Sequence, residues 1–213
     1  MPKLTATLLL LCTALFAQQK GTFTDTRDGK IYKTTKIGEQ VWMAENLNYE
    51  AKGSRCYGEG GKVYGGTTLS NAEIQAYCNK YGKLYNWETA MKACPSGWHL
   101  PNKAEWEVLA ATIGGDTIAG KYLKATNGWN ENGNGEDKFG FSALPGGYGW
   151  EDGIFDDVGN AGDWWSSFSK KNIAYRWYIG YESSIRSYYE GKDDLYSVRC
   201  LQDTPAPPKG EAK

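Results

Sequence analysis

The cysteines constrain this chain more than any other feature of its sequence. One of the five, Cys12, lies in an apolar N-terminal run, and the other four lie in the body of the chain, at Cys56, Cys78, Cys94 and Cys200. In an oxidising compartment four cysteines predict two disulfides, although they allow three pairings. No two are spaced as C-x-x-C and His99 is the only histidine, so we expect no metal site, no redox motif and no cofactor.

The N-terminus has the pattern of a secretory signal. Lys3 precedes an apolar run over residues 8–16 that ends at the small residue Ala17. The run is too short for a membrane-spanning helix, and Cys12 follows a leucine where a lipid-anchor motif has a small residue. We therefore predict that residues 1–17 are removed and that the protein is secreted or held in the cell envelope.

The composition predicts one nearly neutral domain. Loss of residues 1–17 removes one lysine and lowers the formal net charge from −1 to −2, which gives no electrostatic basis for binding nucleic acid or an anionic membrane. The length predicts a single domain over residues 18–203, with no transmembrane segment. Residues 204–213 form a Pro-rich tail that we expect to be disordered or extended.

Helices are predicted in the first half of the mature chain. Ser70 is placed to cap a short helix. Leu84, Trp87 and Met91 recur at helical spacing and predict a second helix that buries one face. A capping-box pattern opens a third apolar stripe, over residues 102–113. These helices precede most of the predicted strands, an order typical of α+β proteins.

Strands are predicted on both sides of the helices. Asp28-Gly29 is a hairpin turn signal within an extended segment, 24–48. Because neighbouring residues of a strand face opposite sides, we expect one of Trp164 and Trp165 in the core and the other exposed. The later strands are predicted at Phe139–Leu144, Trp164–Phe168, Tyr175–Ile179 and Tyr196–Cys200.

Three ordered stretches resemble a known family. F-T-D-T-R-D-G-K-I-Y and V-W-M-A-E-N-L lie within residues 23–47, and A-C-P-S-G-W-H-L-P-N-K-A-E-W covers residues 93–106. F-S-A-L-P-G-G follows, and S-V-R-C closes the set at residues 197–200. Together they resemble the Fibrobacter succinogenes major paralogous domain, a family of exported bacterial proteins without an established activity.

That family is similar to the C-type-lectin-like fold of lectin domains and formylglycine-generating sulfatase-modifying enzymes. The resemblance implies helices packed on twisted antiparallel sheets, with V-R-C in the last strand. It also implies a bridge from Cys94 to Cys200, worth roughly 4 to 5 kcal/mol in the chain-entropy model, and a smaller loop closed between Cys56 and Cys78, worth roughly 3 kcal/mol.

The resemblance does not carry over the enzymatic chemistry. The sulfatase-modifying enzymes use a close pair of cysteines near the C-terminus, whereas this chain has only Cys200 there. His99 lies in a motif that leads into a helix, where we expect a packed imidazole. Paired carboxylates can perform acid and base catalysis, but those clustered around Gly153 are better explained by a solvated turn: Glu151, Asp152, Asp156 and Asp157. We therefore expect no enzyme.

A sugar site needs planar rings for stacking, with amides and carboxylates for the hydroxyl groups. Trp129-Asn130-Glu131 imitates the W-N-D signature of calcium-dependent lectins, but the chain lacks their E-P-N and Q-P-D signatures. Phe141 stands where a calcium loop beginning at Asn130 has its closing Glu, so we expect no calcium. The candidate ligand-binding residues are Trp129, Asn130, Asn132, Trp150, Asp152 and Asp156.

Two functional hypotheses follow. The first is a non-catalytic extracellular module that recognises polysaccharide or another cell-surface component. The alternative is a structural or protein-interaction component of the cell envelope. A third, an enzyme related to the sulfatase-modifying group, is disfavoured by the single cysteine near the C-terminus.

Overall fold

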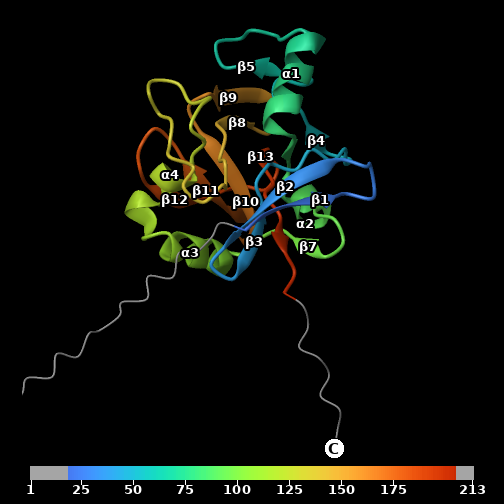
Figure 1. Ribbon diagram of the computed structural model, residues 1–213. Coiled ribbons are helices and arrows are strands. Elements are labelled where there is room, and N and C mark those ends of the chain that lie inside the picture. The colour runs from blue at the N-terminus through green and yellow to red at the C-terminus, as the bar shows by residue number, and fades with distance from the viewer. Residues whose placement is uncertain (1–18, 205–213) are drawn as a thin grey trace, which may run out of the picture.

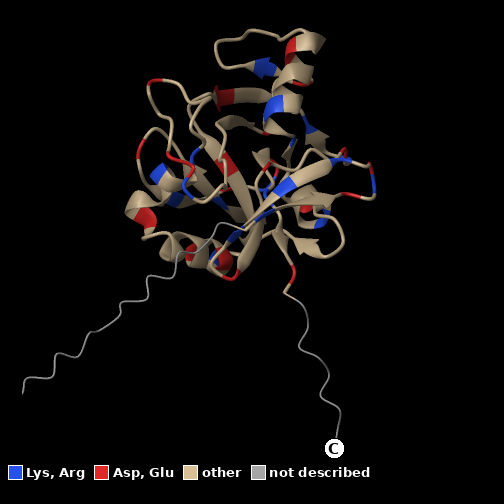
Figure 2. Ribbon diagram, in the orientation of Figure 1, with Lys and Arg blue, Asp and Glu red and all other residues tan. Residues whose placement is uncertain are grey.

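The computed structural model describes residues 19–204 as two β-sheets with four helices packed around them (Figure 1). The predicted signal peptide with Cys12, and tail residues 205–213, lie outside the described residues. In Figure 2, acidic and basic residues are interspersed over the visible strands and helices, in keeping with the small net charge. No helix among residues 19–204 has the length and apolar character needed to cross a bilayer.

The first sheet is built on the predicted N-terminal hairpin. Asp28-Gly29 forms the turn, in which the Asp25 carbonyl accepts a 2.8 Å bond from the Gly29 amide. The order of the five strands is β1-β2-β3-β14-β7, so that the closing segment of the chain enters between two earlier strands. These strands are β1 (Lys20–Thr24), β2 (Ile31–Ile37), β3 (Gln40–Met43), β14 (Leu201–Gln202) and β7 (Trp98–His99).

The second sheet has nine strands in the order β4-β6-β13-β10-β8-β9-β5, with β11 and β12 branching from β10. Most pairs are antiparallel, but β10 pairs in parallel with β13 and β8, and β5 pairs in parallel with β9. The strands are β4 (Ser54–Arg55), β5 (Lys62–Val63), β6 (Leu84–Tyr85), β8 (Gly146–Gly149), β9 (Ile154–Val158), β10 (Gly162–Lys170), β11 (Ile173–Ile179), β12 (Ile185–Gly191) and β13 (Tyr196–Ser197).

Side-chain capping explains where three of the four described helices begin. Ser70 caps α1, as predicted, and forms a full capping box with Glu73; the predicted capping box of Asn102 with Glu105 opens α3. The buried face of α3 is the predicted stripe, which packs into the main core around Trp42 and Trp164. The helices are α1 (Asn71–Tyr81), α2 (Trp87–Ala93), α3 (Lys103–Thr112) and α4 (Asp116–Leu123).

The two disulfides join distant parts of the chain. Cys94, at the end of α2, is bonded to Cys200, which directly precedes β14. Cys56 is bonded to Cys78 in α1. Both pairings agree with the bridges that the family resemblance implies. The α+β prediction is confirmed by the four helices and the two largely antiparallel sheets.

The predicted helix through Leu84, Trp87 and Met91 is wrong in its first turn and in its buried face. Leu84 lies in β6, because the chain pairs there with β4 and β13. Asn86 is the N-cap of the helix: its side chain accepts a 3.0 Å bond from the Thr89 amide, so the helix begins at Trp87. Met91 is 42% exposed, and the buried face consists of Trp87, Ala90 and Ala93.

Two predicted strands also differ from the structure. Residues 139–144 form only an isolated bridge, since the Asp137 carboxylate accepts bonds from the Ser142 amide and hydroxyl and holds Ser142 at φ 52°. The segment from Tyr196 to Cys200 divides instead of running as one strand. Its first two residues form β13 in the second sheet, and the chain then crosses to β14 in the first sheet.

Trp164 and Trp165 are both fully buried, contrary to the expectation that one is exposed. They do face opposite sides of β10, but each side is covered. Trp164 packs in the core that contains α3, and Trp165 packs edge to face against Tyr196 at 4.6 Å. The Nε1 of Trp165 donates to the Tyr85 carbonyl at 2.7 Å. Over residues 162–166, β10 is therefore an internal strand with two buried faces.

Candidate functional site

A polar surface hollow lies where the loop after α4 meets the turn after β9. Its volume is about 250 Å³. The rim combines amide, carboxylate and phenol groups over an indole floor. The residues that line it are Trp129, Asn130, Glu131, Asp157, Asn160 and Tyr181.

Trp129 forms the floor of this hollow. Its side chain is only 6% exposed, and its Nε1 donates to the Ala143 carbonyl at 3.0 Å. The Trp129 amide donates to the Asn134 Oδ1 at 3.1 Å, which closes the loop back on itself. Trp129 therefore supports the site and offers little ring surface for stacking.

Asn130 connects the two loops of the rim. Its amide donates to the Gly159 carbonyl at 2.8 Å, and its Nδ2 donates to the Asn160 Oδ1 at 3.1 Å. Gly159 has φ 88°, a backbone conformation that favours glycine, and a Cβ there would stand 2.5 Å from the Asn130 Nδ2. The backbone bond between Asn130 and Gly159 thus holds the amide pair in place.

The carboxylates of the rim are Glu131 and Asp157. Burial raises the pKa of Asp157 above its usual range, and the neighbouring Asp156 acts in the same direction, while Asn160 and Arg176 oppose the shift. Glu131 and Asp157 have φ values of 51° and 59°, which are uncommon for residues with a side chain. Both carboxylates therefore project from locally strained backbone, a feature often found at functional sites.

Tyr181 stands at the open side of the hollow with 72% of its surface exposed. Its loop is held from below by Lys124, whose Nζ donates to the carbonyls of Gly180, Tyr181 and Glu182 at 3.1, 3.1 and 3.0 Å. The Nζ also lies 5.1 Å from the Trp129 ring centroid. Burial lowers the pKa of Lys124. The Lys124 ammonium group thus holds in place both the Trp129 indole and the loop that carries Tyr181.

The structure brings together only part of the predicted site. Trp129 and Asn130 line the hollow, and Asn132 is exposed in the same loop at φ 60° without lining it. The remaining predicted residues belong to the β8–β9 hairpin. Trp150 is half-buried and packs edge to face on Tyr148 at 5.0 Å, and its amide donates to the Ile154 carbonyl. That hairpin also contains Asp152 and Asp156.

The carboxylates of this hairpin have local structural contacts. The Asp152 Oδ1 accepts a 3.0 Å bond from the Ile154 amide, and the Asp156 Oδ1 accepts a 2.7 Å bond from the Asp157 amide. Among residues 19–204, no group of three or more His, Cys, Asp or Glu side chains is arranged to hold a metal ion.

Four residues of the hollow were not among the predicted site residues. Glu131 was noted only in the imitation of W-N-D, and Asp157 was interpreted as part of a solvated turn. Asn160 gives no local signal, because its partner Asn130 is 30 positions away. Tyr181 lies between Gly180 and the polar run Glu182-Ser183-Ser184, and an aromatic residue in such a setting is a usable signal for an exposed ring. The positions of Asn160 and Tyr181 beside the loop after α4 are not visible in the local sequence pattern.

The fold and the hollow define a class of protein, a disulfide-linked α+β domain with a polar surface hollow. The chain belongs to the Fibrobacter succinogenes major domain family, whose model matches residues 35–202. No curated protein and no solved structure matched the chain.

Proposed function

We propose that this protein is an exported, non-catalytic binding module that recognises a glycan through the hollow at Tyr181. One observation carries the proposal: a ring that is 72% exposed borders a hollow whose rim supplies two amides and two carboxylates. A pyranose presents an apolar face to stack on a ring and hydroxyl groups around its edge for polar side chains. The arrangement suits a sugar better than a flat apolar ligand.

A C-type-lectin-like fold is the architecture that we propose for this module. The support is the L-P-x-x-x-E-W motif that opens α3, together with a closing strand that enters between β3 and β7. All four cysteines among residues 19–204 are paired in disulfides, which supports a binding role over thiol chemistry. Export by the N-terminal segment is part of the proposal, and N-terminal sequencing of the protein recovered from cells and medium tests it.

The test of glycan binding compares two equally exposed tyrosines. Tyr181→Ala removes the ring beside the hollow, and Tyr64→Ala removes a ring with the same 72% exposure elsewhere on the surface. On a glycan array and in pulldowns with insoluble polysaccharides, we expect Tyr181→Ala to weaken binding about tenfold, equivalent to about 1.4 kcal/mol. Tyr64→Ala should bind like the wild type.

Two outcomes would count against the glycan proposal. One is the absence of binding to every glycan presented. The other is binding that both tyrosine variants leave unchanged or weaken equally. Asn130→Ala adds an independent arm, because it removes the amide that faces Asn160, and it should weaken binding in the same direction as Tyr181→Ala.

A second candidate function is attachment to another protein of the cell envelope. Phe168, Ile173 and Tyr189 are all more than a third exposed, and they come from the three neighbouring strands β10, β11 and β12. Exposed apolar groups of this kind are common at protein interfaces. Cross-linking on intact cells distinguishes this candidate, since it would recover a partner protein that is lost with Phe168→Ser but retained with Tyr181→Ala.

A further inference from the structure

A second polar cleft lies between the end of α1, the start of β2 and the segment 45–48 that follows β3. Its volume is about 240 Å³, and it has no lining residue in common with the hollow at Tyr181. The lining residues that bear on its chemistry are Lys30, Ile31, Glu45, Asn48, Asn79 and Lys80.

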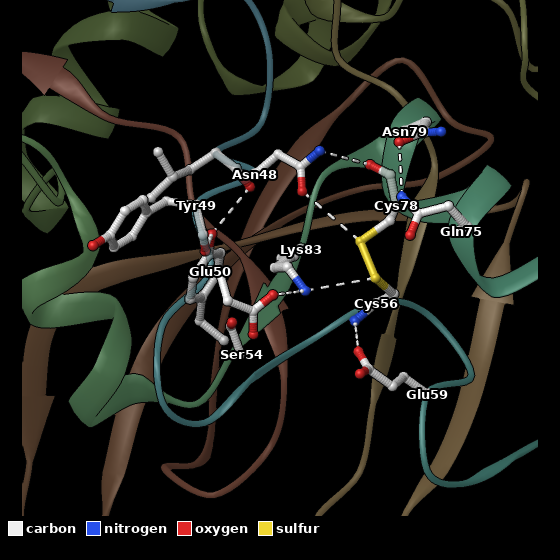
Figure 3. Close-up of a disulfide and its surroundings, with 12 residues drawn as sticks. Asn48, Tyr49, Glu50, Ser54, Cys56, Glu59, Gln75, Cys78, Asn79 and Lys83 are labelled. Atoms are coloured by element: carbon white, nitrogen blue, oxygen red, sulfur yellow. Dashed lines mark hydrogen bonds and ion pairs between the residues drawn. A yellow bond between two sulfur atoms is a disulfide. The ribbon is translucent and has the colours of Figure 1, made fainter. Parts of the chain in front are cut away.

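Two asparagines connect the segment 45–48 to the C-terminal end of α1. The Asn46 Nδ2 donates to the Tyr81 carbonyl at 2.9 Å, and the Asn48 Nδ2 donates to the Cys78 carbonyl at 3.2 Å. The Cys78 carbonyl also accepts a 3.0 Å bond from the amide of Gly82, the C-cap residue, so the asparagine contacts reinforce the end of the helix. The Cys56–Cys78 disulfide fixes the same helix end, and Figure 3 shows the side chain of Asn48 beside it. The cleft is therefore preformed.

Three polar atoms of the lining side chains have no hydrogen-bond partner among residues 19–204. The Asn48 Oδ1 lies 3.8 Å from the Cys78 Sγ, a disulfide sulfur without a hydrogen to donate. Asn79 uses its Oδ1 to accept from the Gln75 Nε2 at 3.0 Å, which leaves its Nδ2 unused (Figure 3). The third atom is the Nζ of Lys80, which lies over a tyrosine ring.

The charges around the cleft favour an anion. Lys30 and Lys80 line it, and Arg199 lies fully buried next to it, bound to the Asn46 Oδ1. The Lys30 Nζ is already engaged, since it lies 3.3 Å from the Asp28 Oδ2 and donates to the Asn48 carbonyl. Glu45, the acidic member of the lining, is likewise paired: its Oε2 accepts a 2.7 Å bond from the Lys33 amide, and its Oε1 lies 3.9 Å from the Lys33 Nζ. Lys80 forms no ion pair among residues 19–204, so its charge is the one left for an anion.

We propose that this cleft binds a uronate unit, that is, a sugar ring that carries a carboxylate. Lys80 supplies charge-assisted donors for the carboxylate. Asn48 accepts from one sugar hydroxyl and Asn79 donates to another, while the exposed Ile31 side chain covers an apolar face of the ring. The volume is below the roughly 300 to 1,000 Å³ of sites for drug-sized ligands, which suits a single ring.

The test is an NMR titration of the isotope-labelled, disulfide-bonded protein with sodium D-glucuronate at low ionic strength. We expect shifts at the amides of Asn48, Asn79 and Lys80. Lys80→Glu should weaken binding at least about tenfold. The matched control is Lys92→Glu, since Lys92 is also an exposed lysine in the last turn of a helix, at the end of α2, and this variant should bind like the wild type.

Two other ligands and one other variant complete the design. Glucose lacks the carboxylate and acetate lacks the ring, so both should bind much more weakly than glucuronate. Tyr181→Ala should leave glucuronate binding unchanged, which separates this cleft from the glycan proposal above. The inference is overturned if glucuronate produces no shifts, if acetate binds equally well, or if Lys92→Glu weakens binding as much as Lys80→Glu.

Discussion

Arg199 donates from its Nη2 to the Oδ1 of Asn46 at 2.7 Å, in a part of the core where the arginine is fully buried. The same oxygen accepts from the Trp164 Nε1 at 2.8 Å. The carbonyls of Met43 and Phe141 complete the shell, and no carboxylate forms an ion pair with Arg199 among residues 19–204. Burial lowers the pKa of Arg199 to about 9, so the guanidinium group is still charged at neutral pH. Its hydrogen-bond acceptors are all uncharged oxygens.

The first prediction concerns this shared acceptor. Asn46→Ala removes the oxygen that serves both Arg199 and Trp164, and it leaves a charge buried without its main partner. We expect the free energy of unfolding to fall by about 3 to 5 kcal/mol, the cost of breaking a buried charged contact from one side. Urea denaturation followed by tryptophan fluorescence measures it.

Asn172→Ala is the control for this measurement, because Asn172 is an exposed asparagine in the turn between β10 and β11. Its effect should remain within about 0.5 kcal/mol. A loss below about 1 kcal/mol for Asn46→Ala would show that Arg199 finds other acceptors or water.

The second prediction ranks the two disulfides. The Cys94–Cys200 bridge spans 106 residues and the Cys56–Cys78 bridge spans 22. In the chain-entropy model the double alanine variants lose roughly 4 to 5 and roughly 3 kcal/mol respectively. Thermal and urea unfolding of the two variants tests the order. A larger loss for the short loop would mean that native contacts, such as that of the Lys83 Nζ at 3.6 Å from the Cys56 Sγ, outweigh the entropy of the unfolded chain.

The features of the fold that were predicted correctly depend on interactions between residues that are close in the sequence. The Asp28-Gly29 turn and the capping boxes at Ser70 and Asn102 all depend on neighbours within three or four positions. The prediction of a helix through Leu84 was wrong because pairing with β4 and β13 overrode the local periodicity. The prediction that one of Trp164 and Trp165 is exposed was wrong because Tyr196, which covers Trp165, comes from a strand distant in the sequence.

The candidate site shows the same division. Trp129 and Asn130 were found from their local loop chemistry, whereas Asn160 and Tyr181 join them only through tertiary contacts. Trp129 was predicted as a stacking surface, but its side chain is buried, with its Nε1 bound to the Ala143 carbonyl. A pattern of residues can therefore locate a polar aromatic loop without showing which of its rings remains exposed.

The third prediction concerns the support of Tyr181. Lys124→Met keeps the length of the side chain but removes the ammonium group that binds three carbonyls of residues 180–182. Because those carbonyls lose their shared donor, we expect faster hydrogen exchange over residues 180–184 and weaker glycan binding. Hydrogen exchange with mass spectrometry at neutral pH measures the first effect without any ligand.

The matched control for this variant is Lys138→Met, an exposed lysine near the Tyr122 ring, which should leave exchange over residues 180–184 unchanged. If Lys124→Met also leaves that exchange unchanged, Lys124 does not position the loop. Loss of protection throughout the protein, in contrast, would assign to Lys124 a role in global stability and would equally contradict a local one.

The fourth prediction is a pH dependence of stability that comes from Asp163. This residue is fully buried in β10, forms an ion pair with Arg176, and has an Oδ2 without a hydrogen-bond partner among residues 19–204. Burial raises the pKa of Asp163 to about 7 against the opposing charge of Arg176. The folded state therefore holds a proton that the unfolded state has already released between about pH 4 and pH 7.

The sign follows from this difference in bound protons. Where the folded state binds more protons than the unfolded state, the free energy of unfolding falls as the pH rises. The contribution of Asp163 is thus complete below about pH 4 and is lost as the pH rises through about 7. We expect the stability of the wild type relative to Asp163→Asn to decrease by a few kcal/mol across this range, at about 1.4 kcal/mol per unit of pKa shift.

Urea denaturation of both proteins at several pH values between 4 and 8 measures the difference, which cancels the titration of all other groups that the two share. Asp193→Asn, at an exposed position, should keep the wild-type slope. A difference between wild type and Asp163→Asn that grows with pH would mean that the ion pair with Arg176 outweighs burial and keeps Asp163 ionised throughout. In that case the unpartnered Oδ2 would require a buried water molecule as its donor, since a carboxylate cannot remain charged at full burial with only one oxygen bound.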